Sequence, residues 1–300
     1  MINGKQIKKV AIVLRPKNHS DFESIIPTLV KWLTRRKKSV FFLITEKDRV
    51  EKFVKSNAKL IEYIDFKDLA KIDLIISLGG DGTLIGLSRR AKSTFPPIFG
   101  ANLGKLGFVT EFSKVELFEE LEHLLTKGKE LMSVNLYCAE IFSKGKSVSK
   151  SFFVNDAVLS KNDLSRMFTL SLDINDEHVY KLSGDGLIVS SPLGSTAYSL
   201  AAGGPIIHPL VSSMVLTPVC PHSLTHRPIV IPNTSKVMIQ NLETNENIML
   251  TLDGQEGISI GPKMKVLISR SKTKNIKLVK NNNKAFFHTL KEKLTHGRRN

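Results

Sequence analysis

The stretch IDLIISLGGDGTL, residues 72–84, joins an apolar run to a turn that holds three glycines and one carboxylate. The run at 72–78 has the length of a buried strand and is far shorter than the roughly 18 apolar residues that suggest a membrane span. Residues 84–91, directly after the turn, have helical character. A buried strand that leads through a glycine turn into a helix is typical of an α/β fold, in which ligands bind at the carboxyl ends of parallel strands.

The same alternation of strand and helix signals extends through the first 128 residues. Apolar runs predict further strands at 9–14, 40–44 and 98–101. Apolar positions at helical spacing predict helices around 25–33 and 115–125. We therefore predict that residues 1–128 form an α/β domain with a parallel sheet.

A different pattern begins near residue 129. Short apolar runs at 132–142 and 151–159 flank the turn sequence SKGK, and runs at 168–174 and 177–182 flank Asn175 and Asp176. Later runs centre on 237, 248–252 and 266–268, and a helical pattern covers 284–294. Because short strands separated by turn signals are typical of all-β architecture, residues 129–282 are predicted to form a β-rich, sandwich-like domain.

Charge and cysteine content narrow the function classes. The formal net charge is +16, with basic clusters at 35–38 and in the tail at 270–300. A nucleic-acid footprint is one interpretation, but no nucleic-acid-binding module is recognisable, which favours a solvated basic surface that attracts small polyanions. Two cysteines, Cys138 and Cys220, make no disulfide framework, and no apolar signal segment opens the chain. We therefore expect a cytoplasmic protein without membrane or nucleic-acid partners.

The glycine turn at 79–83 is the first candidate site. Glycines let the backbone approach a ligand closely, and a helix that begins there points N–H groups at an anion. A carboxylate beside a phosphate is unusual, and Asp81 fits there if it accepts the proton of an attacking hydroxyl or holds a metal ion. The structural alternative is that Asp81 only caps the following helix.

Two further segments have compositions that suit a nucleotide. Residues 181–209 are rich in glycine, small hydroxyl and apolar side chains and contain one lysine and one aspartate among their charged residues. The alternative for this segment is a tightly packed internal strand and turn. Asn155 and Asp156 follow an apolar run and are able to hydrogen-bond a ribose diol or an adenine edge, although the same pair is common in turns.

Other motifs are excluded or have simpler explanations. Position 85 is isoleucine, so the turn is not the dinucleotide-binding fingerprint, and residues 100–106 lack the spacing of a phosphate-binding P-loop. Cys220, His222 and His226 have weak metal-site character because no further cysteine lies nearby. Asp253 and Gly254 are most simply a hairpin turn.

Taken together, these segments resemble the NAD kinase family. The resemblance rests on GGDGT at 79–83, NLGKLGF at 102–108, Asn155-Asp156, GDG at 184–186, GSTAY at 194–198 with GGP at 203–205, and DGQ at 253–255. GGDGT by itself also resembles the lipid kinases and phosphofructokinases, whereas the 184–205 segment is specific. The motifs appear in the family's order and span about residues 72–256.

The resemblance implies transfer of the γ-phosphoryl group of ATP to the 2′-hydroxyl of the adenosine ribose of NAD, giving NADP. It implies a divalent cation, usually Mg²⁺, with the ATP, a dimer or tetramer, and a final helix, within 283–300, that packs back on the first domain. Asp81 would accept the proton, and the turn residues Gly79, Gly80, Gly82 and Thr83 would hold ATP phosphates. The residues at the family's NAD-binding positions are Asp81, Gly82, Phe108, Asn155, Asp156, Arg166, Asp185, Thr196, Ala197, Tyr198, Ser199, Leu200, Ala201 and Gln255.

Three positions depart from the family pattern. Asp156 stands where the family has glutamate, Leu193 where it has threonine, and Ala201 where it has serine. These departures place individual hydrogen bonds to NAD, and the choice between NAD and NADH, in question. Three rivals remain open at this point: a lipid or sugar kinase that uses the same GGDGT turn, a non-catalytic NAD-binding regulator, and a basic nucleic-acid-binding protein.

Overall fold

The computed structural model describes residues 1–91, 95–104, 107–161, 168–223 and 225–295. The chain divides into two compact units. Unit 1 comprises residues 1–134 and 275–300, and unit 2 comprises residues 135–274. The two long strands β7 (Leu131–Ser143) and β18 (Lys265–Val279) carry the chain from one unit to the other. None of the helices in the described ranges combines the length and the apolar composition that crossing a membrane requires.

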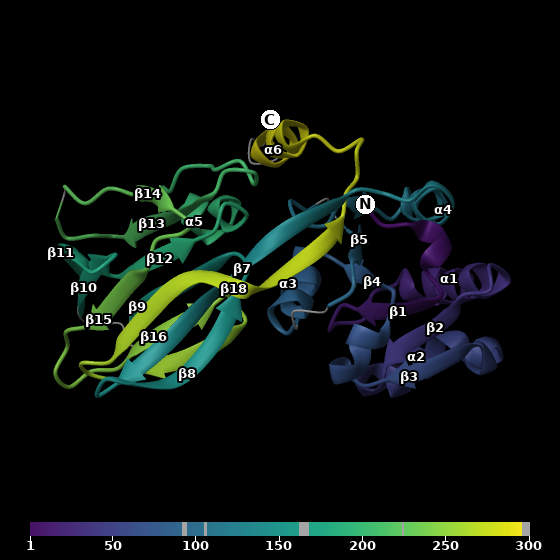
Figure 1. Ribbon diagram of the computed structural model, residues 1–300, viewed down its shortest axis with the longest axis horizontal. Coiled ribbons are helices and arrows are strands. Elements are labelled where there is room, and N and C mark those ends of the chain that lie inside the picture. The colour runs from purple at the N-terminus through teal and green to yellow at the C-terminus, as the bar shows by residue number, and fades with distance from the viewer. Residues whose placement is uncertain (92–94, 105–106, 162–167, 224, 296–300) are drawn as a thin grey trace. The chain divides into compact units, whose positions relative to one another are not determined.

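Unit 1 is built on a parallel sheet with the strand order β3-β2-β1-β4-β5. All six residues of β4 are buried, as its continuous apolar sequence predicts for a strand covered on both faces. Figure 1 shows these strands with α1, α2, α3 and α4 around them. The bounds are β1 Lys9–Leu14, β2 Ser39–Leu43, β3 Ile61–Ile64, β4 Leu74–Gly79, β5 Ile98–Asn102, α1 Phe22–Arg35, α2 Lys47–Val54, α3 Asp81–Arg89, α4 Leu117–Lys127 and α6 Phe286–Thr295.

The strand order creates a switch point beside β4. The chain leaves β1 toward β2 on one side, whereas it leaves β4 toward β5 on the other. Loops that follow two such strands diverge and leave room for a ligand at the carboxyl edge of the sheet. The glycine turn after β4 therefore lies where parallel α/β sheets bind ligands.

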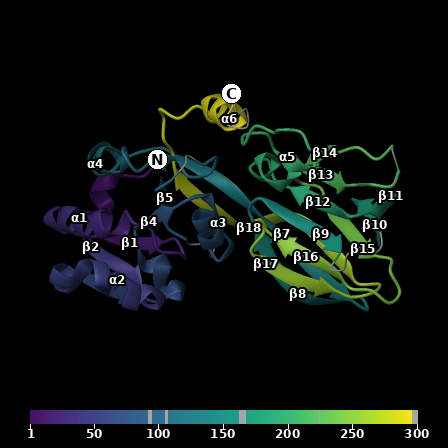
Figure 2. The same ribbon diagram turned by 180° about the vertical axis from the view of Figure 1, so that it is seen from behind.

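Unit 2 is a pair of antiparallel sheets that share one apolar core. One sheet has the order β14-β13-β12-β9-β16-β17, and the other contains β11, β10, β15, β18, β7 and β8. Buried side chains of both sheets, such as Leu159 and Ile239, belong to one cluster; Figure 2 shows the sheets from the back. The remaining bounds are β8 Lys146–Phe153, β9 Asp156–Lys161, β10 Phe168–Ile174, β11 Glu177–Gly184, β12 Gly186–Ser190, α5 Tyr198–Ala201, β13 Ser213–Val219, β14 Ile229–Pro232, β15 Val237–Asn241, β16 Ile248–Leu252 and β17 Glu256–Ile260.

The predicted fold class, an α/β N-terminal part with a parallel sheet followed by a β-rich part, is confirmed. Several elements, among them α2, β12, β13, β14 and β17, were not predicted, and two further details differ from the sequence-based expectation. The apolar run at 151–159 is two strands, β8 and β9, which belong to different sheets and meet at Asn155. The short strand β3 was not predicted, because as an edge strand it is only partly buried and lacks a continuous apolar run.

The hairpin β10–β11 provides a test of the fold. Its two-residue loop holds Asn175 and Asp176 at positive φ, 51° and 67°, the backbone of a type I′ turn. Asn175 also accepts a hydrogen bond from the Lys236 N–H at 2.9 Å, whereas Asp176 is exposed. Because glycine adopts positive φ without steric cost, Asp176→Gly should raise the free energy of unfolding by roughly 0.5–1 kcal/mol.

Thermal or denaturant unfolding measures the effect. Glu177→Gly is the matched control, because this exposed residue lies within β11, where glycine should lower stability by roughly 0.5–1 kcal/mol. Equal destabilisation by both substitutions would contradict the assigned turn.

Candidate active site

Asp81 is the first residue of α3 and lies two residues after Gly79, the last residue of β4. Gly80 is the N-cap of the helix, and no side chain caps it by a hydrogen bond. The structural alternative, in which the Asp81 carboxylate caps its own helix, is therefore wrong. The helix also begins three residues earlier than the sequence predicts, since two glycines in the turn obscure its start.

The Asp81 carboxylate instead binds a second turn, at residues 107–110. Oδ2 accepts the N–H of Phe108 at 2.8 Å. Oδ1 accepts the N–H groups of Val109 and Thr110 at 3.2 and 2.8 Å, and the Thr110 hydroxyl at 2.8 Å. Within the part of the chain that the structure describes, Oδ2 thus accepts one hydrogen bond and keeps capacity for another, which a substrate hydroxyl is able to fill.

Two glycines of the motifs lie so close to other side chains that no Cβ atom fits at their positions. A Cβ atom at Gly107 would lie 1.9 Å from Oδ1 of Asp81, which is inside any allowed contact. A Cβ atom at Gly79 would lie 2.2 Å from the Thr83 hydroxyl oxygen. At Gly80, by contrast, the nearest atom would be 3.9 Å away, so packing does not require glycine there.

In unit 2 the Asp253 carboxylate organises the junction between β8 and β9. Its Oδ1 accepts the N–H groups of Asn155 at 2.7 Å and Asp156 at 3.1 Å, and its Oδ2 accepts the Val154 N–H at 2.9 Å. Asp253 and Gly254 are also the predicted hairpin turn, since both have positive φ and the Gln255 N–H binds the Leu252 carbonyl. The sequence shows the turn but not this second role of its carboxylate.

The 191–204 segment packs against the same junction. The Ser191 N–H donates to the Asn155 carbonyl at 2.8 Å, and a Cβ atom at Gly194 would lie 2.1 Å from that oxygen. The hydroxyls of Ser195 and Ser199 are buried in internal hydrogen bonds, to Pro192 and Thr217 respectively. The sequence assigned residues 196–201 of this segment to the NAD site. Of these, Ala197, Tyr198 and Ala201 are exposed, and Thr196 and Leu200 are partly buried.

Burial raises the pKa of the Asp156 carboxyl group. The side chain is 5 % exposed, and burial, reinforced by the nearby Asp253 charge, raises its pKa to about 7. Its neighbour Asn155 has a buried side-chain oxygen without a hydrogen-bond partner in the described residues. Buried acceptors of this kind are normally satisfied, so a ligand donor would complete the Asn155 site.

The other predicted residues are spread over both units. In unit 1 the structure brings Phe108 to Asp81, and Gly82 is exposed in the first turn of α3. In unit 2 the carboxylate of the exposed Asp185 raises the pKa of the Cys220 thiol. Gln255 is exposed in the hairpin turn, and Arg166 lies outside the described residues. The sequence-based list missed Gly107 and Thr110, although Gly107 belongs to the NLGKLGF motif.

Comparison with known proteins agrees with these motifs. Residues 10–129 match the ATP-NAD kinase N-terminal domain, and residues 154–281 match the ATP-NAD kinase C-terminal domain. An NAD kinase of Solibacter usitatus is 35% identical over 294 residues, covering 98% of this chain and 99% of the relative. An NAD kinase of Desulforamulus reducens is 43% identical over 225 residues, covering 75% and 78%.

Solved structures show the same fold. Yeast NADH kinase, crystallised with NADH, has a TM-score of 0.87 at 22% identity and covers 98% of this chain and 89% of its own. An NAD kinase from Archaeoglobus fulgidus, crystallised with ATP, has a TM-score of 0.74 at 22% identity, with coverages of 95% and 98%. The fold and the glycine turns define a nucleotide-dependent phosphotransferase. The chain belongs to the ATP-NAD kinase family, and its activity is the ATP-dependent phosphorylation of NAD.

The contact between Gly107 and Asp81 predicts a sensitive position. Gly107→Ala places a methyl group where the Asp81 carboxylate now lies, so the carboxylate or the turn must move. A displacement near 1 Å is able to cost about 100-fold in rate, and we expect kcat to fall by about 10- to 100-fold. Steady-state kinetics measure this, with Gly257→Ala as the comparison, because this exposed glycine lies outside the site and an added Cβ atom would come no closer than 3.2 Å to the Met249 sulfur. An unchanged kcat for Gly107→Ala would show that the placement of the Asp81 carboxylate does not control the rate.

The raised pKa of Asp156 predicts how stability depends on pH. The folded protein holds this proton more tightly than the unfolded chain, so the contribution of Asp156 to stability is greatest below about pH 4 and is lost as pH rises through about 7. Asp156→Asn removes this titration. The stability of the variant relative to the parent should therefore rise by about 2–4 kcal/mol between pH 4 and pH 8.

Unfolding curves at a series of pH values give this difference. Asp176→Asn, an exposed carboxylate of the same unit, should show no comparable pH-dependent gain. A difference between Asp156→Asn and the parent that is constant with pH would show that Asp156 is an ordinary carboxylate.

Proposed function

We propose that Asp81 is the group that accepts the proton during phosphorylation of NAD. The observation that supports this role is the placement of its carboxylate at the carboxyl edge of the sheet, held by the 107–110 turn, with capacity left on Oδ2. The 2′-hydroxyl of the adenosine ribose attacks the γ-phosphorus of ATP. An O–P bond forms, the bond from the γ-phosphorus to the β-phosphate oxygen breaks, ADP leaves, and the hydroxyl proton passes to Asp81.

The glycine turn is proposed to hold the phosphates of ATP. Helix α3 has nine residues, and its N-terminus, with the exposed Gly82, presents a favourable end of the helix dipole to an anion. Gly80 leaves open space where a side chain would otherwise stand, which allows a phosphate to approach the backbone. Gly79 and Thr83 fix the shape of this turn through their close contact.

Magnesium is proposed to enter with ATP as part of the substrate. Within the described residues, no three His, Cys, Asp or Glu side chains gather into a group that would hold a metal ion. Mg²⁺ in phosphoryl-transfer sites keeps several waters and is bound mainly by substrate phosphates with one or two carboxylates. Phosphate oxygens and waters of this kind are available on ATP itself. A cation bound there neutralises charge on the transferred phosphoryl group.

Asn155 and Asp156 are proposed to bind the adenosine half of NAD. The unpartnered Asn155 oxygen supports a ligand donor at this position, and the Asp253 carboxylate fixes the backbone of both residues. Asp156 is one methylene shorter than the family's glutamate, and a bridging water is able to supply the missing reach. We assign the remaining predicted contacts, Phe108, Arg166, Asp185, the residues 196–201 and Gln255, to the same substrate.

We also propose a domain organisation, an oligomeric state and a cellular location. Residues 1–128 would carry the phosphate turn and residues 129–282 the NAD contacts, with the final helix returning to the first part. The family pattern supports a homodimer or homotetramer. The two cysteines, one buried and one exposed and both free, support a cytoplasmic location.

An activity assay with Asp81→Asn tests the proposed role. Purified protein, ATP, Mg²⁺ and NAD are incubated, and NADP is quantified by mass spectrometry. Because asparagine is not a proton acceptor, kcat should fall by about two to four orders of magnitude. The Asp48→Asn variant, which alters an exposed carboxylate on α2, is the control and should retain the parent rate.

Two outcomes have different meanings. NADP formation by Asp81→Asn at the parent rate would remove Asp81 from the chemistry. A comparable loss of NADP formation in Asp48→Asn would show that the effect does not depend on the position of Asp81.

A further inference from the structure

Lys284 binds the same turn that binds Asp81. Its ammonium group donates to the carbonyl of Gly107 at 3.0 Å and to the carbonyl of Thr110 at 2.8 Å. These two residues begin and end the turn, and the N–H groups of residues 108–110 hold the Asp81 carboxylate. The turn is therefore fixed by two charges of opposite sign, one acting on its N–H groups and the other on its carbonyls.

One peptide group links the two sets of hydrogen bonds. The Gly107 carbonyl belongs to the same peptide group as the Phe108 N–H, so the ammonium group at that oxygen polarises the peptide and makes this N–H a better donor to the Asp81 carboxylate. The hydrogen bond to the Thr110 carbonyl fixes the other end of the turn. Lys284 is half-buried, and burial lowers the pKa of its ammonium group while the charges of Glu111 and Asp81 oppose that shift. Burying an ammonium group costs free energy unless the group is hydrogen-bonded. The bonds to the two backbone carbonyls offset that cost and hold the Lys284 ammonium group at the turn.

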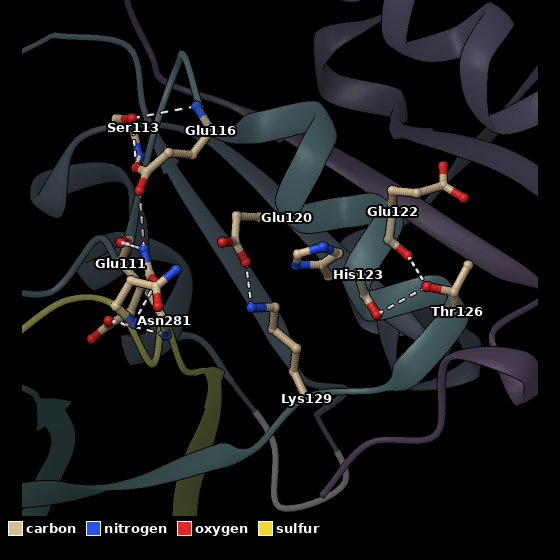
Figure 3. A network of polar contacts seen from close by, with 10 residues as sticks. Glu111, Ser113, Glu116, Glu120, Glu122, His123, Thr126, Lys129 and Asn281 are labelled. Carbon is tan, nitrogen blue, oxygen red and sulfur yellow. Dashed lines mark hydrogen bonds and ion pairs between the residues drawn. The ribbon is translucent and has the colours of Figure 1, made fainter.

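The segment that carries Lys284 is itself anchored. Asn281 is 2 % exposed, and its side-chain amide donates to the Glu111 carbonyl at 3.1 Å and to the Glu116 carboxylate at 3.5 Å. The Asn281 N–H donates to the Glu111 carboxylate at 3.3 Å. Figure 3 shows Asn281 linked to Glu111 and Glu116. These bonds fix the start of the C-terminal segment three residues before Lys284.

Helix α6 continues the contact with the turn. The rings of Phe286 and Phe108 lie with their centroids 6.2 Å apart. The Lys293 ammonium lies 5.7 Å from the centre of the Phe108 ring, within the range of a cation–π interaction. The C-terminal segment thus contacts both the backbone and the aromatic side chain of the turn.

We infer that Lys284 is a positioning residue for phosphoryl transfer, acting through the 107–110 turn on the orientation of the Asp81 carboxylate. The inference rests on the proposed role of Asp81 as proton acceptor. Because Lys284 donates to the backbone of the turn, its loss should affect the geometry of the reacting groups more than the affinity for NAD or ATP. The chemical step should therefore respond to Lys284, and substrate saturation should not.

Lys284→Met tests this directly in the full-length protein, because methionine keeps the length of the side chain and loses the ammonium group. We expect kcat to fall by about 10- to 100-fold while KM for NAD and for ATP stays within about three-fold. Lys284→Arg, which keeps the charge and two donors, should remain within about ten-fold of the parent. Lys280→Met is the matched control, because Lys280 is exposed and pairs with Glu130 at 3.4 Å.

A double variant separates positioning from a general structural role. If Lys284 acts through Asp81, then Lys284→Met in an Asp81→Asn background should lower the residual kcat by less than about three-fold. A merely structural role would lower it by the full single-variant factor. Circular dichroism and melting curves of all variants show whether each protein is folded before its kinetics are compared.

The outcomes distinguish the inference from the proposed function. An unchanged kcat in folded Lys284→Met, with Asp81→Asn still inactive, would overturn the role of Lys284 and leave Asp81 in place. Full additivity in the double variant would also overturn it. Parent-level activity of Asp81→Asn would instead remove the proposed function on which the inference depends.

Discussion

The four hydrogen bonds between the Asp81 carboxylate and the 107–110 turn are the interaction on which the site in unit 1 depends. They join the end of β4 to the chain that follows β5, so two loops of the parallel sheet act as one structure. The same bonds explain why Gly107 has no side chain. The Asp81 carboxylate does not cap its own helix, and backbone N–H groups of the other turn orient it instead. A proton acceptor needs a fixed orientation of this kind.

Unit 2 uses the same physical device a second time. The Asp253 carboxylate accepts the N–H groups of three successive residues, and in doing so it separates β8 from β9 and orients Asn155 and Asp156. Burial beside this charge raises the pKa of Asp156 to about 7. Asp156 is itself one of the residues proposed to bind the adenosine half of NAD. In both units a carboxylate from one turn orders the backbone of another.

The departures from the family pattern fall at positions of different exposure. Leu193, where the resemblance implies threonine in the family, is buried. Ala201 is exposed at the end of α5, where a missing serine hydroxyl removes a donor from the surface. Asp156 keeps its carboxylate but loses one methylene.

The sequence by itself determined the fold class, most strand positions and the family, because these follow from local periodicity, turn residues and ordered motifs. It also marked Asp81, Asn155 and Asp156. It did not determine that β8 and β9 belong to different sheets, that the Asp81 carboxylate binds residues 108–110, or that Asp253 and Lys284 hold distant turns. Those contacts join residues 27 to 177 positions apart, and hydrogen bonds between such distant residues are fixed only when the sheets bring their strand ends together.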